Sequence, residues 1–342
     1  MKRKLLIFLL SLTTLLHAQQ RPKVALVLGG GGAKGAAHVG VLKCIEESGI
    51  PIDIVVGTSI GSIVGGLYSI GYDSQELDSL FRAQQWPILL TDRVQSQAGN
   101  LLSIENDDLY VLGFHFNLNP DKRAKNQDRR YGALKGDSIT SLFETLVAAR
   151  IGREATMSCN FDALPRRFRA MAYDISDFRE VTLSEGSLPL SMRASMSIPL
   201  AFRPVRMGDH LYIDGGVMNN LPVDVARAMG ADYVIAVDLA VNHHDEQDTY
   251  LEDVLGISNE VVLEGKGRFA GLNLINWGLF RPDIALYHRN CENADIYINP
   301  DLAGFGAHDF VASSIATMIR LGEEAGLKAL PQLQQLRREF EE

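Results

Sequence analysis

Short apolar runs alternate with helical patterns along the chain, and glycines mark the turns between them. Residues 23–28 and 52–56 are continuous apolar runs, as is typical of strands buried on both faces of a parallel sheet. A helical stretch follows each run, at residues 36–48 and from about 60 to 70, and Gly49 ends the first. This succession predicts a βαβ unit with a crossover connection.

The same alternation resumes in the second half of the chain, which favours one α/β domain over residues 19–342. Residues 92–136 differ, because clustered charges separate short apolar runs. This excursion is interpreted either as a lid over a site or as a solvated insertion. Elsewhere we expect strands at 168–175, 180–183, 211–214, 233–239 and 294–298, and helices at 188–196, 222–229 and from about 309 onward.

Residues 1–18 have the pattern of a secretory signal peptide. Three basic residues at positions 2–4 precede an apolar run, and Ala18 offers a small residue for cleavage. The run is shorter than the roughly 20 residues that span a bilayer. We expect export across the inner membrane, to the periplasm, the outer membrane or the medium; a retained N-terminal anchor is the alternative.

The composition and net charge of the chain limit which kinds of partner it can bind. Hydrophobic residues make up 46% and charged residues 22%, which is ordinary for a globular protein. The formal charge is −9, and removing residues 1–18 makes it more negative. An acidic chain without a basic cluster is a poor nucleic-acid binder, because that binding needs Lys and Arg on phosphates. We therefore expect no nucleic-acid partner.

The three cysteines, Cys44, Cys159 and Cys291, are far apart and lack metal-type spacing. Neither a disulfide framework nor a zinc site follows from them. Cys44 lies on the apolar side of the 36–48 helix, so a buried thiol is expected. The sequence predicts no metal and no cofactor.

The pentapeptide 57–61, Gly-Thr-Ser-Ile-Gly, lies between an apolar strand and a helix. G-x-S-x-G in this context is typical of a nucleophile elbow, where serine occupies a strained turn above the sheet edge. Gly57 and Gly61 leave room for neighbouring strand and helix. The pattern predicts Ser59 as a nucleophile, with the helix dipole close to developing negative charge.

The glycine-rich loop at residues 29–35 could supply an oxyanion hole. Gly30, Gly31 and Gly32 can turn successive N–H groups toward one point, because glycine tolerates positive φ. Such donors stabilise the oxyanion that forms when a nucleophile attacks an ester. Asp214, followed by Gly215 and Gly216 at a strand end, offers a carboxylate that could accept the serine proton.

A nucleotide-binding loop is the competing interpretation. Gly30, Gly32 and Gly35 fit G-x-G-x-x-G, but Lys34 is followed by glycine and not by the Lys-Ser or Lys-Thr of a Walker A loop. Asp53, at a plausible distance for a ribose ligand, opens a different strand. Nucleotide binding is therefore not favoured.

Taken together, these motifs resemble the patatin-like phospholipase family. That family has a G-G-G-x-K/R-G loop, a G-x-S-x-G elbow and a D-G-G/A motif in this order, and here they stand at residues 30–35, 57–61 and 214–216. Residues 193–199, Arg-Ala-Ser-Met-Ser-Ile-Pro, and 219–223, Asn-Asn-Leu-Pro-Val, also look like the family. The likeness runs from about residue 23 to 325. Within the family, the chain resembles the bacterial, exported members.

The resemblance implies a three-layer αβα sandwich with a mostly parallel central sheet. It also implies a Ser59–Asp214 dyad without histidine and an acyl-enzyme. The expected oxyanion hole contains Gly30, Gly31, Gly32 and Ile60, and the N–H groups of the last three are the preferred donors. The implied substrates are phospholipids or other lipid esters, cleaved without a metal during transient contact with a membrane surface. Lys34 would orient the loop or attract lipid phosphate, or be a simple charge at the helix start.

Two other functions stay open at this point. A Ser-Asp-His triad acting on small soluble esters could use a late histidine, and a non-catalytic lipid-binding module could retain the fold. Head group, acyl position and oligomeric state are left unassigned. By chain order the candidate triad histidines are His243, His244, His288 and His308, whereas His38 and His210 stand in the wrong order.

Overall fold

A computed structural model describes residues 21–92, 132–241 and 283–340 of the chain. The predicted signal peptide, most of the 92–136 excursion, His243 and His244 lie outside the described residues. No helix of the described segments is long and apolar enough to cross a membrane.

The central sheet has a parallel half built from the predicted apolar runs. In spatial order it contains β12, β11, β1 and β2, all paired in parallel. β1 and β2 are buried along their whole lengths, as expected for strands covered on both faces. The bounds are β1 Val24–Leu28, β2 Ile54–Thr58, β11 Tyr233–Val237 and β12 Ile296–Ile298.

Beyond β2 the sheet continues with β5, which pairs in parallel with β2 and antiparallel with β6 and β10. β9 then pairs antiparallel with β10 at the edge. The expectation of a mostly parallel sheet is confirmed, with an antiparallel edge added to it. The bounds here are β5 Arg167–Asp174, β6 Arg179–Leu183, β9 Val205–Met207 and β10 His210–Asp214.

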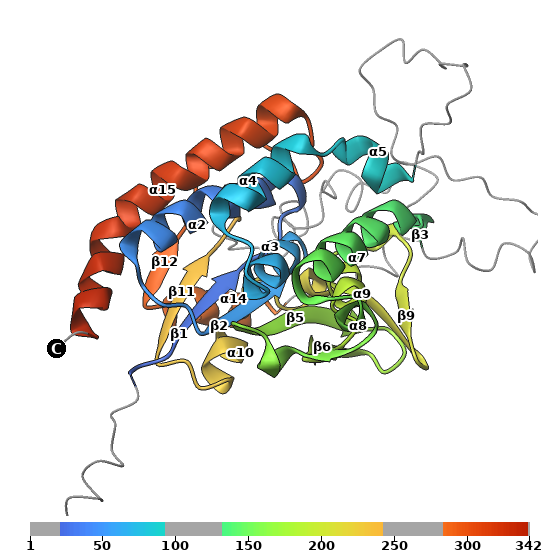
Figure 1. Cartoon of the computed structure of the whole chain (residues 1–342), viewed down its shortest axis with the longest axis horizontal. Helices are drawn as coiled ribbons and strands as arrows, with labels where there is room; N and C mark the ends of the chain where they lie inside the picture. The colour runs from blue at the N-terminus through green and yellow to red at the C-terminus, as the bar shows by residue number, and fades with distance from the viewer. Residues whose placement is uncertain (1–20, 93–131, 242–282, 341–342) are drawn as a thin grey trace, which may run out of the picture.

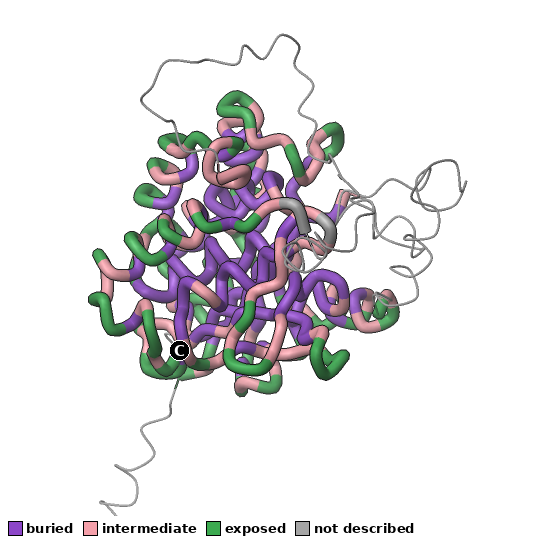
Figure 2. Tube along the Cα trace, turned by 90° about the vertical axis from the view of Figure 1, so that its right-hand side faces the viewer, coloured by how far each residue is buried: buried purple, intermediate pink, exposed green. Residues whose placement is uncertain are grey.

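Helices cover both faces of the sheet, which makes a three-layer αβα arrangement (Figure 1). One face packs against α2, α3, α9 and α15, and the other against α10 and α14. Buried residues gather in the middle of the molecule and exposed ones at its periphery (Figure 2). These helices are α2 Ala36–Ser48, α3 Ile60–Ser69, α9 Leu188–Ser195, α10 Val223–Ala228, α14 Ile284–Glu292 and α15 Ala312–Glu339.

Further elements fill the remaining described segments. The helices are α4 Ser74–Ala83, α5 Trp86–Thr91, α7 Asp137–Ile151 and α8 Glu154–Met157, with 3₁₀ turns η1 Gly32–Gly35, η3 Phe161–Ala163 and η4 Gly215–Val217. The short strands are β3 Gly132–Leu134, β4 Cys159–Asn160, β7 Glu185–Gly186 and β8 Leu200–Phe202.

The predicted elements are found in the predicted order, with small shifts at their ends. α2 has the expected bounds, because Gly49 adopts a left-handed conformation (φ 69°) that stops it. β2 begins two residues later than the apolar run at 52–56, and Pro222 caps α10 from outside the helix. Cys44 is 1% exposed, so the predicted buried thiol is confirmed.

The two described ends of the 92–136 excursion meet. The Asp92 carboxylate accepts hydrogen bonds from the N–H groups of Gly136 and Ser138, both at 2.8 Å. β3 then pairs with β8 close to the segment that leads into β9. The excursion therefore starts after α5 and ends before α7 at one place.

Candidate active site

Two strand ends meet head to head along one side of β5. Thr58 of β2 pairs with Met171, and Asp214 of β10 pairs with Ala172, the next residue of β5. β2 runs parallel to β5 and β10 antiparallel, so both carboxyl ends point at the same place. This junction brings Ser59 beside Asp214, although 155 positions separate them in the sequence.

The turn after β2 has the backbone strain of a nucleophile elbow. Ser59 has φ 54° and ψ −125°, a conformation that a non-glycine residue rarely adopts. A Cβ at Gly57 would lie 2.4 Å from the Gly61 carbonyl oxygen, and one at Gly61 would lie 2.1 Å from that of Leu28. Both glycines are therefore required by close approach of backbone.

Ser59 and Asp214 form a buried hydrogen-bonded pair. The Ser59 Oγ donates to Asp214 Oδ2 at 2.6 Å, while the Gly216 N–H donates to Oδ1 at 2.8 Å. Ser59 is 4% exposed and Asp214 1%. A Cβ at Gly215 would lie 2.6 Å from the backbone of Met171, so the glycine lets the turn after Asp214 lie against β5.

Burial tunes the carboxyl group. It raises the pKa of Asp214 from 3.8 to about 7, and the hydrogen bonds from Ser59 and the Gly216 N–H oppose that rise. A carboxylate with a pKa near the working pH is a far better base than an exposed aspartate. The raised pKa and the hydrogen bond therefore suit Asp214 to act as a base toward the Ser59 hydroxyl.

The glycine-rich loop lies against the serine. A Cβ at Gly30 would lie 3.0 Å from Ser59 Cβ and 2.4 Å from Asn220 Oδ1. The Gly30 N–H, which was one candidate oxyanion donor, donates to the Asn220 carbonyl at 3.3 Å. Within the described segments no acceptor takes the N–H groups of Gly31, Gly32 or Ile60. Those three N–H groups therefore stay available to a ligand, whereas the N–H of Gly30 is engaged.

The remaining loop residues set its shape. Gly35 packs on Ile60, where a Cβ would lie 2.1 Å from Cγ1, and this contact seats the loop on the start of α3. Gly32 has φ 56° and packs on the Ala307 carbonyl. Lys34 is 2% exposed, which argues against a solvated helix-start charge and favours a role in orienting the loop.

His38 holds the beginning of the loop, a role that sequence reasoning missed. Its ring is fully buried, and Nε2 lies 2.8 Å from the Gly29 carbonyl oxygen. Because a carbonyl only accepts, Nε2 carries the proton. Burial lowers the pKa of His38 to about 4, so the ring is neutral at physiological pH.

Two serines and two asparagines, also not predicted individually, hold the motifs in place. The Ser59 N–H donates to Ser195 Oγ at 2.9 Å, and the Asp214 N–H donates to the Ser197 carbonyl at 3.0 Å. Thr58 Oγ1 donates to the Asn219 carbonyl, and Asn220 Nδ2 to that of Gly30. In the sequence, the only indication of these four residues was that the stretches 193–199 and 219–223 also resemble the family.

The late histidines that the structure describes do not join the site. His288 lies in α14 with its ring against Tyr287, and the His308 side chain is 79% exposed next to Asp309. Among the described residues, no histidine bonds to Ser59 or Asp214. A triad through His243 or His244 concerns residues outside this description.

One group in the described parts of the chain has metal-ligand chemistry: Asp174, Asp177 and His210. His210 Nδ1 lies 2.7 Å from Asp174 Oδ2, as in an ion pair, and Asp174 Oδ1 accepts the Ser176 N–H. The group does not include Ser59 or Asp214. The expectation of metal-free chemistry stays a prediction.

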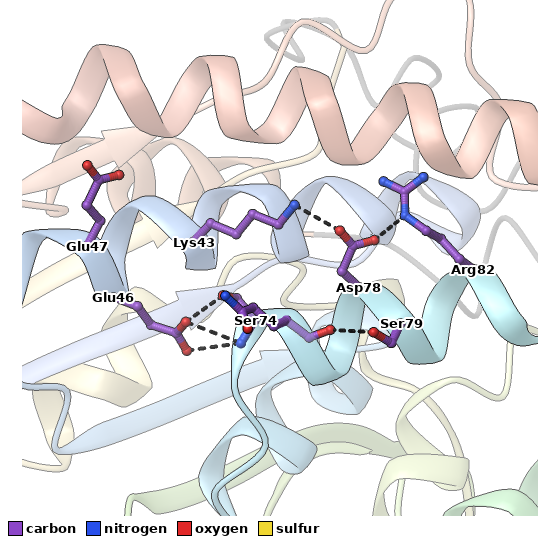
Figure 3. Close-up of a pocket in the computed structure, with 8 residues that line it drawn as sticks. Lys43, Glu46, Glu47, Ser74, Asp78, Ser79 and Arg82 are labelled. Carbon is purple, nitrogen blue, oxygen red and sulfur yellow. Dashed lines mark hydrogen bonds and ion pairs between the residues drawn. The ribbon is translucent and has the colours of Figure 1, made fainter.

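A groove of about 600 Å³ lies between α2 and α4 (Figure 3), and neither Ser59 nor Asp214 is among the residues that line it. Three of its charged side chains form ion pairs: Lys43 Nζ lies 2.9 Å from Asp78, which also binds Arg82. Glu46 accepts the Ser74 N–H at 3.1 Å and the Ser74 hydroxyl. Most of the polar side chains that line the groove are therefore bound to one another.

Comparison with known proteins identifies the family of this chain. Residues 26–227 match the family model described as patatin-like phospholipase, and that range contains the glycine loop, the elbow and Asp214. The chain belongs to the patatin-like phospholipase family.

The curated relatives it matches are much longer than this chain. Mouse (Mus musculus) patatin-like phospholipase domain-containing protein 6 is 33% identical over 235 residues, which cover 68% of this chain and 15% of that protein. Lysophospholipase nte1 of Aspergillus fumigatus is 31% identical over 234 residues, which cover 68% and 13%. The chain thus spans a small part of these relatives.

Among solved structures, VipD from Legionella pneumophila has a TM-score of 0.46 at 13% identity, covering 91% of this chain and 67% of that one. This likeness is too distant to carry an argument about function.

Proposed function

We propose that this protein hydrolyses acyl esters of lipids through a Ser59–Asp214 dyad and an acyl-enzyme. The observation that carries the proposal is the 2.6 Å hydrogen bond from Ser59 Oγ to a buried Asp214, made at a strained elbow beneath a glycine loop. Membership of the patatin-like phospholipase family supports the reaction class.

The first half-reaction transfers the acyl group to the enzyme. Ser59 Oγ attacks the ester carbonyl carbon while its proton moves to Asp214 Oδ2. The oxyanion of the tetrahedral intermediate accepts hydrogen bonds from the N–H groups of Gly31, Gly32 and Ile60. When the intermediate collapses, the C–O bond to the alcohol breaks, and the alcohol takes the proton from Asp214.

The second half-reaction releases the acid. Asp214, ionised again, takes a proton from water as the oxygen attacks the acyl-enzyme carbonyl. The new intermediate expels Ser59 Oγ, which recovers its proton from Asp214. Ester and water are consumed, and an alcohol and a carboxylic acid are formed. The strained elbow keeps Oγ at the same place through both halves.

The substrate class is inferred from the relatives. One bears the name lysophospholipase and another the name patatin-like phospholipase, so phospholipids or lysophospholipids are the proposed substrates. Such molecules reside in or near membranes, and transient contact with a membrane surface belongs to the proposal. Export rests on the signal-like residues 1–18 alone and is tested by determining the N-terminus of the mature protein.

The decisive experiment combines a fluorophosphonate probe with lipid hydrolysis in chelator. We expect one labelled peptide containing Ser59, and release of fatty acid from phospholipid or lysophospholipid vesicles that stops in proportion to labelling. If the protein releases no fatty acid from either lipid or from a soluble ester, and Ser59 is not labelled, the proposed function is wrong.

A further inference from the structure

Arg193 is a buried cation behind the candidate active site. It lies in the last turn of α9 and is 2% exposed, among the largest fully buried side chains. One terminal nitrogen donates to Ser197 Oγ at 2.5 Å, and the other to the Lys135 carbonyl at 2.7 Å. The guanidinium also lies over the Phe202 ring, 4.8 Å from its centroid.

The partners of this cation are neutral. Among the described residues no carboxylate forms an ion pair with Arg193. Asp92 and Asp137 act on it only through their fields, and burial lowers its pKa to about 10, so it is charged at neutral pH. Burying a charge is costly unless hydrogen bonds satisfy it. The two terminal nitrogens of the planar guanidinium meet this need in part, because each finds an acceptor in a fixed direction, whereas Nε has no hydrogen-bond partner among the described residues.

Arg193 joins α9 to the paired strands β3 and β8. Gly136, just after β3, lies on the guanidinium, and a Cβ there would be 2.2 Å from Nε. Leu134 of β3 pairs with Phe202, and its carbonyl accepts the Arg203 N–H at 2.9 Å. The residues where the 92–136 excursion returns are thus fixed to the end of α9.

The segment just after Arg193 touches both members of the dyad. Ser195 Oγ receives the Ser59 N–H, and the Ser197 carbonyl receives the Asp214 N–H. The Ser197 hydroxyl lies between, since it accepts from Arg193 and donates to the Arg193 carbonyl at 2.8 Å. A shift of Ser197 therefore moves Asp214 relative to Ser59.

We propose that Arg193 is a positioning residue for the dyad: by fixing Ser197 it sets the distance between Asp214 and Ser59. The inference rests on the proposed function. It assigns to the stretch 193–199 a task in catalytic geometry and not only in packing. An error of about 1 Å in such geometry can cost 100-fold in rate.

The test compares Arg193→Met, Arg193→Lys and Ser197→Ala with Arg206→Met, an exposed arginine on β9 as the matched control. Turnover of a soluble ester is measured per active site, counted by fluorophosphonate titration, so misfolded protein does not enter kcat. We expect kcat to fall about 10- to 100-fold in Arg193→Met with KM unchanged, and no change in the control. Arg193→Lys keeps the charge but cannot span both acceptors, so we expect its kcat to fall, but less than that of Arg193→Met.

A second readout separates positioning from packing. The hydrogen bond from Ser59 lowers the pKa of Asp214, so loosening it moves the acid limb of kcat/KM to higher pH. Ser197→Ala should move it in the same direction, and the double variant should be no worse than Arg193→Met alone. If Arg193→Lys and Ser197→Ala keep wild-type kcat per site and acid limb, the inference is wrong. An inert, unlabelled wild type would instead refute the proposed function.

Discussion

Among the described residues, two pairs join a serine hydroxyl to a carboxylate, and their surroundings differ. Ser59 and Asp214 lie at a strand junction, and Ser74 and Glu46 lie in the groove between α4 and α2 (Figure 3). Ser59 has positive φ and faces a glycine loop, whereas Ser74 begins a helix capped by Asp73 in the ordinary way. The contact between hydroxyl and carboxylate is therefore not what defines the reactive pair.

The two carboxylates differ in burial and in the number of hydrogen bonds that they accept. Asp214 is fully buried with only two donors, so its pKa rises toward neutrality, while Glu46 is half-buried and accepts three contacts from Ser74 alone. Near Ser59, the N–H groups of Gly31 and Gly32 have no acceptor among the described residues, and they are the proposed oxyanion donors. The comparison teaches that burial and backbone geometry, rather than the hydroxyl–carboxylate contact itself, distinguish the proposed catalytic pair.

The largest expected difference between the pairs is the loss of the nucleophile. We expect Ser59→Ala to lower kcat by about 10,000-fold or more, as removal of a catalytic serine does elsewhere, with the fold intact by circular dichroism. Ser74→Ala, the matched control, should retain full turnover of a soluble ester. Loss of activity in Ser74→Ala and not in Ser59→Ala would reverse the assignment of the two pairs.

Removing the base should cost somewhat less. Asp214→Asn keeps the size of the side chain and an acceptor for Ser59, yet it cannot take a proton, so we expect kcat to fall about 1,000-fold. Glu46→Gln in the other pair should change kcat less than twofold. Substantial residual turnover in Asp214→Asn would direct the search to His243 and His244.

How much of this could be predicted from the sequence depends on the separation of the partners. The ends of α2 follow from local residues, since Gly49 and Pro51 stop the helix, and the capping box of Asp73 and Glu76 could have revealed α4. The elbow and the glycine loop are local as well. The residues of each motif are adjacent in the sequence, so each motif could be predicted without knowing the fold.

The supporting contacts could not be predicted in that way. Ser195 lies 136 positions from Ser59, and no local pattern shows that its hydroxyl meets the Ser59 N–H. The engagement of the Gly30 N–H by Asn220 and the burial of His38 likewise depend on the packed loop. Family resemblance pointed to those stretches, but only the strand junction explains their contacts.

The pH dependence of turnover tests the electrostatic side of the comparison. In the proposed mechanism ionised Asp214 is the base, so kcat/KM for an uncharged soluble ester should fall as pH drops through about 7, the raised pKa of that carboxyl. The expected loss approaches tenfold per pH unit below it. A profile that stays flat down to pH 5 would mean that Asp214 ionises like an exposed aspartate, and burial would then not explain its basicity.

The smallest effect is expected in the groove itself. Lys43 pairs with Asp78 at 2.9 Å and is partly exposed, and such pairs contribute about 0–1 kcal/mol to stability. Lys43→Met should therefore lower the melting temperature by no more than a few degrees and leave hydrolysis of soluble ester and phospholipid vesicles unchanged. If Lys43→Met weakens hydrolysis of vesicles while hydrolysis of the soluble ester is unaffected, the groove takes part in lipid binding. The region of Ser74 and Glu46 would then contribute to the same reaction as Ser59 and Asp214.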